Sequence, residues 1–396
     1  MKNTFCFILI SIFVIGCKHE SSFRIITNEK RFILDFFPSI KFSGTFLKSD
    51  KIFYFFCDPN TAKKIAFFND KSELIQITSL NKIIENETNP YVVRDIHVLS
   101  KDSILLLKNQ QNKLVLLDGK GNLLKDIDLS QFYSNNLDYE LSSYFIEEFS
   151  NNFYKDGIFL SCRLSPRNFS HDAVIGERER LNQHRIEPLF IQFKDLFNDE
   201  ELEVKKHLKG FLKGRYSKNY MGELHMSFGK VISDKLLLTS ILSDSVFIYN
   251  HKKMKITDTV KVKSKYTPIG GEPYFINKEN MNNASILNRE QTLFNGYIYR
   301  ILYDKKNGYT FFLVTHKRES KEYDKRDLKP RPFSIIAYDD DFNKVDETIL
   351  DGERYLVGFC FITKDGILIR KRDNPKHNNK RNEKKVFDFD LLVFDD

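Results

Sequence analysis

Alanine is scarce in this chain, with five residues among 396, whereas phenylalanine occurs 37 times and tyrosine 18 times. Because alanine is the strongest helix former and aromatic residues favour strands, this composition predicts strands rather than a helical bundle. Hydrophobic residues make up 41% of the chain, so a wholly disordered protein is excluded. The length exceeds one ordinary domain of roughly 100–200 residues, but all-β rings often use such a length as one unit.

Long apolar runs are also few. The run 5–15 follows the short segment Met1-Lys2-Asn3-Thr4. It is too short to span a bilayer, which takes roughly 20 residues, but it suits the apolar part of a secretory signal peptide. No later stretch approaches the roughly 18 apolar residues of a spanning helix, so we expect none elsewhere.

The apolar run ends in Val14-Ile15-Gly16-Cys17, which resembles the bacterial lipobox. The resemblance implies that 1–16 is a lipoprotein signal peptide, that Cys17 carries a diacylglycerol anchor in the membrane, and that 17–22 is a lipidated tether. No Asp follows Cys17, which in this class implies the outer membrane, on its periplasmic or cell-surface face. The alternative is an ordinary signal peptide cut nearby, which would leave Cys17 or Cys6 without a role.

Beyond Cys6 in the expected signal peptide and the expected lipidated Cys17, three cysteines remain, Cys57, Cys162 and Cys360. They form no CxxC pair, and each lies in or beside an apolar run. We expect them to be buried as small hydrophobic residues. One disulfide among the three stays open as an alternative, and it would leave one thiol unpaired.

A polar turn between two apolar runs recurs six times, at 48–51, 100–103, 155–157, 233–235, 305–308 and 363–366. A second marker, a strand ending in a large apolar residue before Asp or Asn, also recurs six times. Together they predict six units of four short strands at 42–80, 91–129, 144–208, 224–262, 294–350 and 355–396. The last unit stops before a fourth strand, which Phe23–Thr27 or Arg31–Phe36 would supply.

This layout resembles the TolB-like or NHL-like six-bladed β-propellers, particularly bacterial lipoproteins of unknown function that combine a lipobox with a propeller. The resemblance implies one all-β domain at 23–396, with six blades of four antiparallel strands and an N-terminal strand completing the last blade. It implies no catalytic residues. A ring of seven or eight blades and a two-domain β-sandwich remain alternatives.

Extra residues fall between the second and third strands of units three, five and six, and these insertions are basic. Segment 370–385, for example, has eight Lys or Arg residues against two acids. In a propeller these loops emerge on one face together with the connections between blades. We therefore expect non-enzymatic binding of a partner protein or an anionic ligand (a glycan or a lipid phosphate) there, through Arg215, Tyr216, Lys218, Arg326, Arg331, Arg370, Lys371 and Arg372.

The alternative without a binding role is that these loops are only solvated and lysine-rich. A carbohydrate-active lyase or lactonase with its site in the propeller channel is the second hypothesis, and a purely structural envelope protein is the third. The chain lacks G-x-S-x-G, H-E-x-x-H and P-loop motifs, so we predict no catalytic residue, cofactor or metal site. The expected envelope location argues against a nucleic-acid partner.

Overall fold

The structure is a computed structural model that describes residues 22–34, 40–49, 51–59, 61–84, 93–108, 113–128, 139–142, 153–154, 157–164, 190–194, 203–208, 226–232, 234–240, 243–271, 293–318, 329–372 and 385–394. Within these ranges β-strands dominate, and the single helix is the four-residue α1 (Asn81–Ile84). The expectation of a strand-rich, all-β chain is confirmed. No helix in the described residues is long and apolar enough to cross a membrane.

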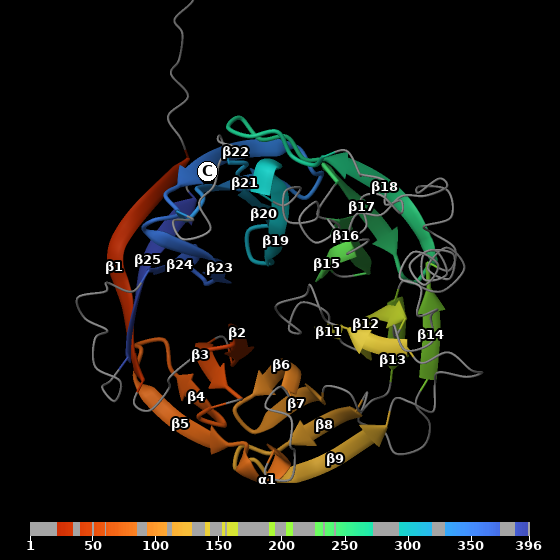
Figure 1. Cartoon of the computed structure of the whole chain (residues 1–396), viewed down its shortest axis with the longest axis vertical. Helices are drawn as coiled ribbons and strands as arrows, with labels where there is room; N and C mark the ends of the chain where they lie inside the picture. Colours follow the sequence, from red (N-terminus) through yellow and green to blue (C-terminus); the bar gives the residue numbers. More distant parts are fainter. Residues whose placement is uncertain are drawn as a thin grey trace, which may run out of the picture.

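The strands form separate antiparallel sheets arranged around a ring, which identifies a β-propeller (Figure 1). The first two sheets contain β2 (Phe42–Lys48), β3 (Lys51–Asp58), β4 (Lys64–Phe68) and β5 (Leu74–Ser79), then β6 (Val93–Ser100), β7 (Ser103–Lys108), β8 (Lys113–Leu117) and β9 (Leu123–Asp128). Two later sheets contain β15 (Met226–Ile232), β16 (Lys235–Ser240), β17 (Ser245–Asn250) and β18 (Lys255–Lys261), then β19 (Tyr297–Asp304), β20 (Tyr309–Thr315), β21 (Phe333–Tyr338) and β22 (Lys344–Leu350).

The prediction of six four-stranded blades is corrected by the third sheet in chain order. Five sheets are four-stranded blades, whereas this one has five strands, β10 (Tyr139–Ser142), β11 (Phe153–Tyr154), β12 (Gly157–Leu164), β13 (Phe190–Lys194) and β14 (Glu203–His207). The physical reason is that two short strands, β10 and β11, share the long strand β12 as a partner. The unit also begins at β10, before the predicted start at residue 144.

The first strand of the chain lies at the outer edge of the last sheet, whose order is β1-β25-β24-β23. This sheet contains β1 (Phe23–Leu34), β23 (Tyr355–Ile362), β24 (Ile367–Lys371) and β25 (Lys385–Phe394). β1 runs antiparallel to β25, with Phe23 opposite Phe394 and Leu34 opposite Lys385. It includes the candidate segment Phe23–Thr27 and residues 31–34 of the candidate Arg31–Phe36, whose last two residues lie outside the described ranges. The N-terminal strand thus pairs with the end of the chain and covers the edge that β25 would otherwise expose.

The Asp or Asn after the third strand of a blade has a structural cause. Asp118 Oδ1 accepts hydrogen bonds from the backbone nitrogens of Lys120 (2.9 Å) and Asn122 (2.8 Å), which closes the turn into the fourth strand. Asn69, Asn250 and Asp339 accept equivalent backbone hydrogen bonds in their own turns. This repeated side chain therefore caps a tight turn in four of the blades.

Apolar side chains fill the interfaces between neighbouring sheets. Phe32 of β1 is fully buried and contacts the rings of Tyr54, Phe56, Phe68 and Phe389, which joins the last sheet to the first. The predicted burial of two cysteines is confirmed, because Cys57 and Cys360 are both buried free thiols. For Cys162 the structure describes the backbone pairing within β12.

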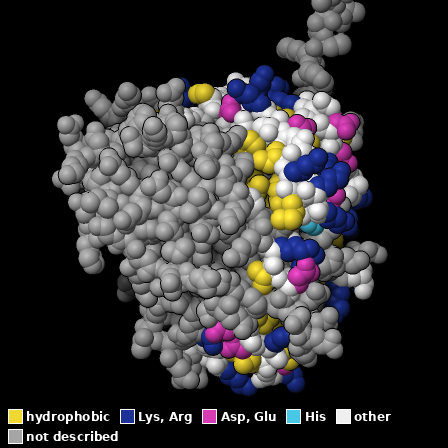
Figure 2. Space-filling view, turned by 90° about the vertical axis from the view of Figure 1, so that its right-hand side faces the viewer, with side chains coloured by type: hydrophobic (Ala, Val, Ile, Leu, Met, Phe, Trp, Pro, Cys, Tyr) yellow, Lys and Arg dark blue, Asp and Glu magenta, His cyan; other side chains and the backbone are white. Residues whose placement is uncertain are grey.

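Antiparallel strands fix which loops share an end of the ring. The turns from first to second strand, and from third to fourth, lie at one end, which we call the turn face. The loops from second to third strand lie at the other end with the connections between sheets, and we call this end the insertion face. Figure 2 shows the ring from one side, where described Lys and Arg side chains lie among acidic and hydrophobic ones.

Candidate functional site

Four of the eight predicted binding residues fall within the described ranges. Arg331 precedes β21, Arg370 and Lys371 end β24, and Arg372 follows that strand. The other four, Arg215, Tyr216, Lys218 and Arg326, lie outside the described residues, as does Cys17.

Arg370 departs from the predicted placement in an exposed loop. It is 6% exposed within β24, and its guanidinium lies 4.7 Å from the Phe359 ring centre and 4.1 Å from that of Phe387. The cause is that β24 extends to Lys371, so Arg370 points from a sheet into its core interface rather than from a loop. Its charge therefore interacts with aromatic faces inside the protein.

Lys371 also has a structural partner. Its ammonium lies 3.1 Å from Asp390 Oδ1 and donates a hydrogen bond to Asn28 Oδ1. The Asp390 carboxylate is fully buried and also accepts hydrogen bonds from the Tyr355 hydroxyl (2.7 Å) and from Arg354 Nη2 (2.8 Å). Lys371 therefore helps hold β1 on the last sheet, and this role competes with ligand binding.

Arg331 and Arg372 come from loops of neighbouring sheets, and both contact Gly352. Gly352 lies buried in the connection from β22 to β23, and its carbonyl accepts a hydrogen bond from Arg372 Nε. The backbone of Arg331 packs so closely on Gly352 that a methyl group there would overlap the Arg331 carbonyl. The connection thus brings two of the predicted residues together on the insertion face.

Further cations surround this contact. Arg354 is exposed beside Gly352, although its Nη2 also pairs with Asp390, and Lys329 is exposed where its ammonium lies 3.9 Å from Glu353. Arg318 Nη2 donates a hydrogen bond to the Lys329 carbonyl at 2.6 Å. We call this group, Arg318, Lys329, Arg331, Arg354 and Arg372, the arginine rim.

Arg331 is held against an aromatic ring. Its guanidinium carbon lies 5.3 Å from the centre of the Tyr297 ring, and Nη2 donates a hydrogen bond to the Tyr297 hydroxyl at 3.3 Å. Burial lowers the pKa of Arg331, and the neighbouring charge of Arg318 lowers it further. Burial likewise lowers the pKa of Arg372. Guanidinium pKa values start so high that all these groups stay charged at neutral pH, so the rim concentrates positive charge.

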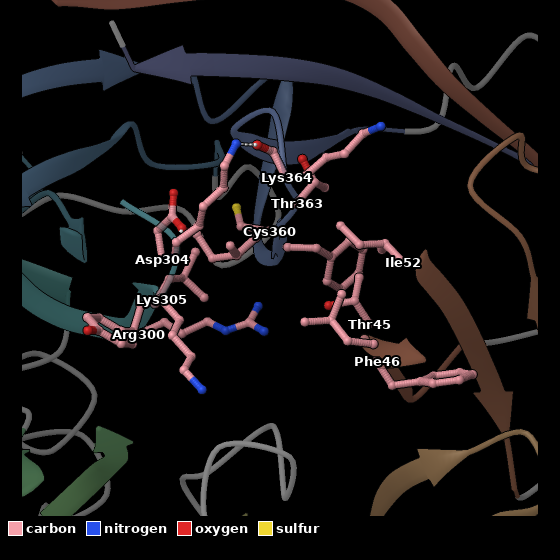
Figure 3. A pocket seen from close by; sticks show the side chains of 16 residues that line it. Thr45, Phe46, Ile52, Arg300, Asp304, Lys305, Cys360, Thr363 and Lys364 are labelled. Atoms are coloured by element: carbon pink, nitrogen blue, oxygen red, sulfur yellow. Dashed lines mark hydrogen bonds between the residues drawn. The ribbon is translucent and has the colours of Figure 1, made fainter. Parts of the chain in front are cut away.

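A cavity of about 470 Å³ lies at the turn face, away from the rim. The inner strands β2, β19 and β23 and the turns that follow them line it. Arg300 of β19 is 4% exposed, and Figure 3 shows its guanidinium pointing into the space between these strands. Nη1 of Arg300 donates a hydrogen bond to the Gly358 carbonyl at 3.1 Å.

Arg300 is not among the residues predicted from the sequence. The available signal was a single charged residue inside the apolar run 297–303. The direction of the Arg300 side chain depends on irregular strand pairing. The register shifts between Ile298 and Arg300 in β19 and between Tyr355 and Cys360 in β23. Such bulges redirect side chains and cannot be located from alternation alone.

Among the residues that the structure describes, no three His, Cys, Asp or Glu side chains gather in a group that could hold a metal ion. His97 is buried on the inner strand β6. His171 and His184 lie outside the described residues.

No protein-family profile matches the sequence, and a search of curated proteins finds no significant relative. Among solved structures, the chain is similar to a member of the DUF4221 family from Bacteroides vulgatus, with a TM-score of 0.62 and 16% identity over 94% of this chain and 99% of that one. It also matches an exported protein from Bacteroides fragilis (TM-score 0.44, 10% identity, 93% and 95% covered) and a streptogramin B lyase (0.37, 14%, 93% and 98%). The first of these similarities supports the β-propeller fold.

Proposed function

We propose that this chain is a lipid-anchored envelope propeller that binds an anionic ligand or partner, without catalysis, at the arginine rim. The observation that carries the proposal is the convergence of Arg331 and Arg372 on Gly352, which joins cations from two neighbouring sheets. Acidic or sulfated glycans fit this chemistry, because guanidinium groups bind carboxylate and sulfate oxygens in pairs.

The rim favours an anion through both charge and geometry. Against its five cations the connection carries two acids, Asp351 and Glu353; Asp351 accepts a hydrogen bond from the Glu353 backbone, and Glu353 lies near Lys329. Clustered cations raise the local potential over a Debye length of about 8 Å in physiological salt. We propose that Arg215, Tyr216, Lys218 and Arg326 extend the same surface.

We also propose how many blades the ring has and how the protein is anchored. The five-stranded sheet is the sixth blade of a TolB-like or NHL-like ring, and Cys17 carries the diacylglycerol that places the protein at the outer membrane. Mass spectrometry of the mature N-terminal peptide tests the anchor. It should find a lipidated Cys17 in the native protein, whereas a peptide that begins elsewhere and lacks lipid contradicts the anchor.

Retention on immobilised heparin tests the rim. The double variant Arg331→Gln/Arg372→Gln should elute at lower salt than the native protein. The matched control Lys71→Gln/Lys120→Gln removes two exposed charges from turn-face loops and should elute close to the native position. Equal elution of the two double variants would remove the rim as the binding surface.

A further inference from the structure

The cavity at the turn face has the dimensions of a ligand site. Its volume of about 470 Å³ lies within the roughly 300–1,000 Å³ typical of small-molecule sites. Three consecutive sheets of the ring contribute to it, the fifth through β19, the last through β23 and the first through β2. The rim lies at the opposite end of the ring, so a ligand in the cavity would not contact the rim.

The side chains that line the cavity carry an excess of positive charge. Four cations, Arg300, Lys305, Lys306 and Lys364, line it together with a single carboxylate, Asp304. Both oxygens of that carboxylate accept hydrogen bonds from its own turn, Oδ1 from the Lys306 nitrogen at 3.0 Å and Oδ2 from Asn307 Nδ2 at 2.8 Å. Asp304 is therefore engaged in shaping the turn, and the cavity favours an anion.

The cations occupy two depths. Arg300 is buried in the wall, near enough to the Cys360 thiol that its charge opposes the rise that burial causes in the thiol pKa. Lys305, Lys306 and Lys364 lie in the turns at the mouth, where Lys306 Nζ is 3.5 Å from the Lys364 carbonyl (Figure 3). An anion would thus meet exposed lysines first and a buried guanidinium further in.

Apolar side chains make up much of the remaining wall, which limits the kind of anion that fits. The lining includes Ile52 from the first sheet, Leu302 from the fifth and Ile362 from the last. Small inorganic anions would leave these surfaces in contact with water, whereas an organic acid would cover them.

We propose that this cavity binds a small organic carboxylate with an apolar body. The carboxylate meets the Arg300 guanidinium, and the body packs against Ile52 and Leu302. The guanidinium favours a carboxylate because its parallel N–H groups match the two oxygens.

Isothermal titration calorimetry of the mature lipoprotein with 4-phenylbutyrate tests this proposal, with a titration into protein-free detergent subtracted. We expect saturable binding to one site and no binding of 4-phenylbutylamine, which has the same ring and chain with a positive charge. Arg300→Gln should weaken the affinity roughly 10- to 100-fold, the usual effect of removing a charged hydrogen bond.

A second variant keeps the test decisive if Arg300→Gln fails to fold. Thr45 lines the cavity from β2, and Thr45→Trp should fill it and abolish binding without changing any charge. The proposal is overturned if the native protein shows no saturable binding, if the amine binds equally well, or if Thr45→Trp binds like the native protein. Arg331→Gln/Arg372→Gln should bind 4-phenylbutyrate normally, so the cavity and the rim can fail separately.

Discussion

Asn28 and Asp390 are joined across 362 residues of chain by a hydrogen bond of 2.7 Å from the Asn28 backbone nitrogen to Asp390 Oδ1. Asn28 has a φ of +57° and lies where the pairing between β1 and β25 shifts register, between Ile26 and Lys30. Asparagine tolerates this left-handed conformation better than most residues. The bulge thus directs a backbone donor at a buried carboxylate in the last sheet, and this contact helps close the ring.

Replacing Asp390 with Asn should destabilise the protein by roughly 2–4 kcal/mol at pH 7, because buried donors lose a charged acceptor. Thermal or urea unfolding measures the effect. Asp388→Asn is the matched control, since its partner Arg31 on β1 is 63% exposed and such surface pairs contribute about 0–1 kcal/mol. Equal losses for the two variants would show that the buried network does not stabilise the closure.

The effect of Asp390→Asn should also depend on pH. Burial alone would raise the pKa of Asp390, but hydrogen bonds from Asn28, Tyr355 and Lys371 together hold it below its usual value. A lowered folded-state pKa contributes stability that is complete above the unfolded pKa of about 3.9 and is lost as pH falls through the folded value. The stability difference between native protein and variant should therefore be largest near neutral pH and shrink below about pH 4.

Phe32→Ala should cost roughly 3–5 kcal/mol, because it removes a buried ring from the interface between the last and first sheets. Ile33, the next residue of β1, is 48% exposed, and Ile33→Ala should change stability little. The free energies of unfolding of the two variants decide whether β1 is packed as described. Comparable small losses would contradict closure of the ring by this strand.

Gly352→Ala should lower stability by roughly 1–3 kcal/mol, since its methyl group would overlap the Arg331 carbonyl. The displaced backbone should also reduce retention on heparin. Glu353→Ala, an exposed neighbour, is the control and should leave the melting temperature almost unchanged. If Gly352→Ala melts and elutes like the native protein, the close contact that forms the rim is absent in solution.

The two described cysteines should be unreactive in the folded protein. Burial raises the pKa of Cys360 to about 12, with Arg300 opposing the shift, and burial also raises the pKa of Cys57. Since the thiolate is the reactive form, Cys57 and Cys360 should resist a thiol reagent at pH 8 and react after denaturation. A Cys6→Ser/Cys17→Ser/Cys162→Ser background limits the titration to these two thiols, and rapid labelling of the folded protein would contradict their burial.

Much of the ring could be predicted from sequence, because tight turns impose local residue preferences. The Asp or Asn that caps the turn into a fourth strand, such as Asp118 and Asp339, correctly marked the end of the third strand. The insertions predicted between second and third strands lie there in the structure, for instance between β20 and β21. The third sheet departed from this pattern because its inner strand is divided, which no turn residue signals.

The candidate site was predicted less well, because it depends on side-chain direction. Arg370, Lys371 and Arg372 are consecutive cations, yet Arg370 stacks on two phenylalanines, Lys371 pairs with Asp390 and Arg372 reaches Gly352. Successive residues of a strand face opposite ways, so a run of like charges at a strand end divides among different environments. The number of charged residues in a segment of sequence does not show which of these environments each side chain enters.

Arginine modification by phenylglyoxal, read by mass spectrometry with and without a heparin fragment, tests the central claim most directly. Binding at the rim predicts that the fragment slows modification of Arg354 and Arg372, which are exposed, while Arg31, exposed on β1, reacts at an unchanged rate. Equal modification rates of the rim arginines in both conditions, or protection of Arg31 to the same extent, would contradict anion binding at the arginine rim.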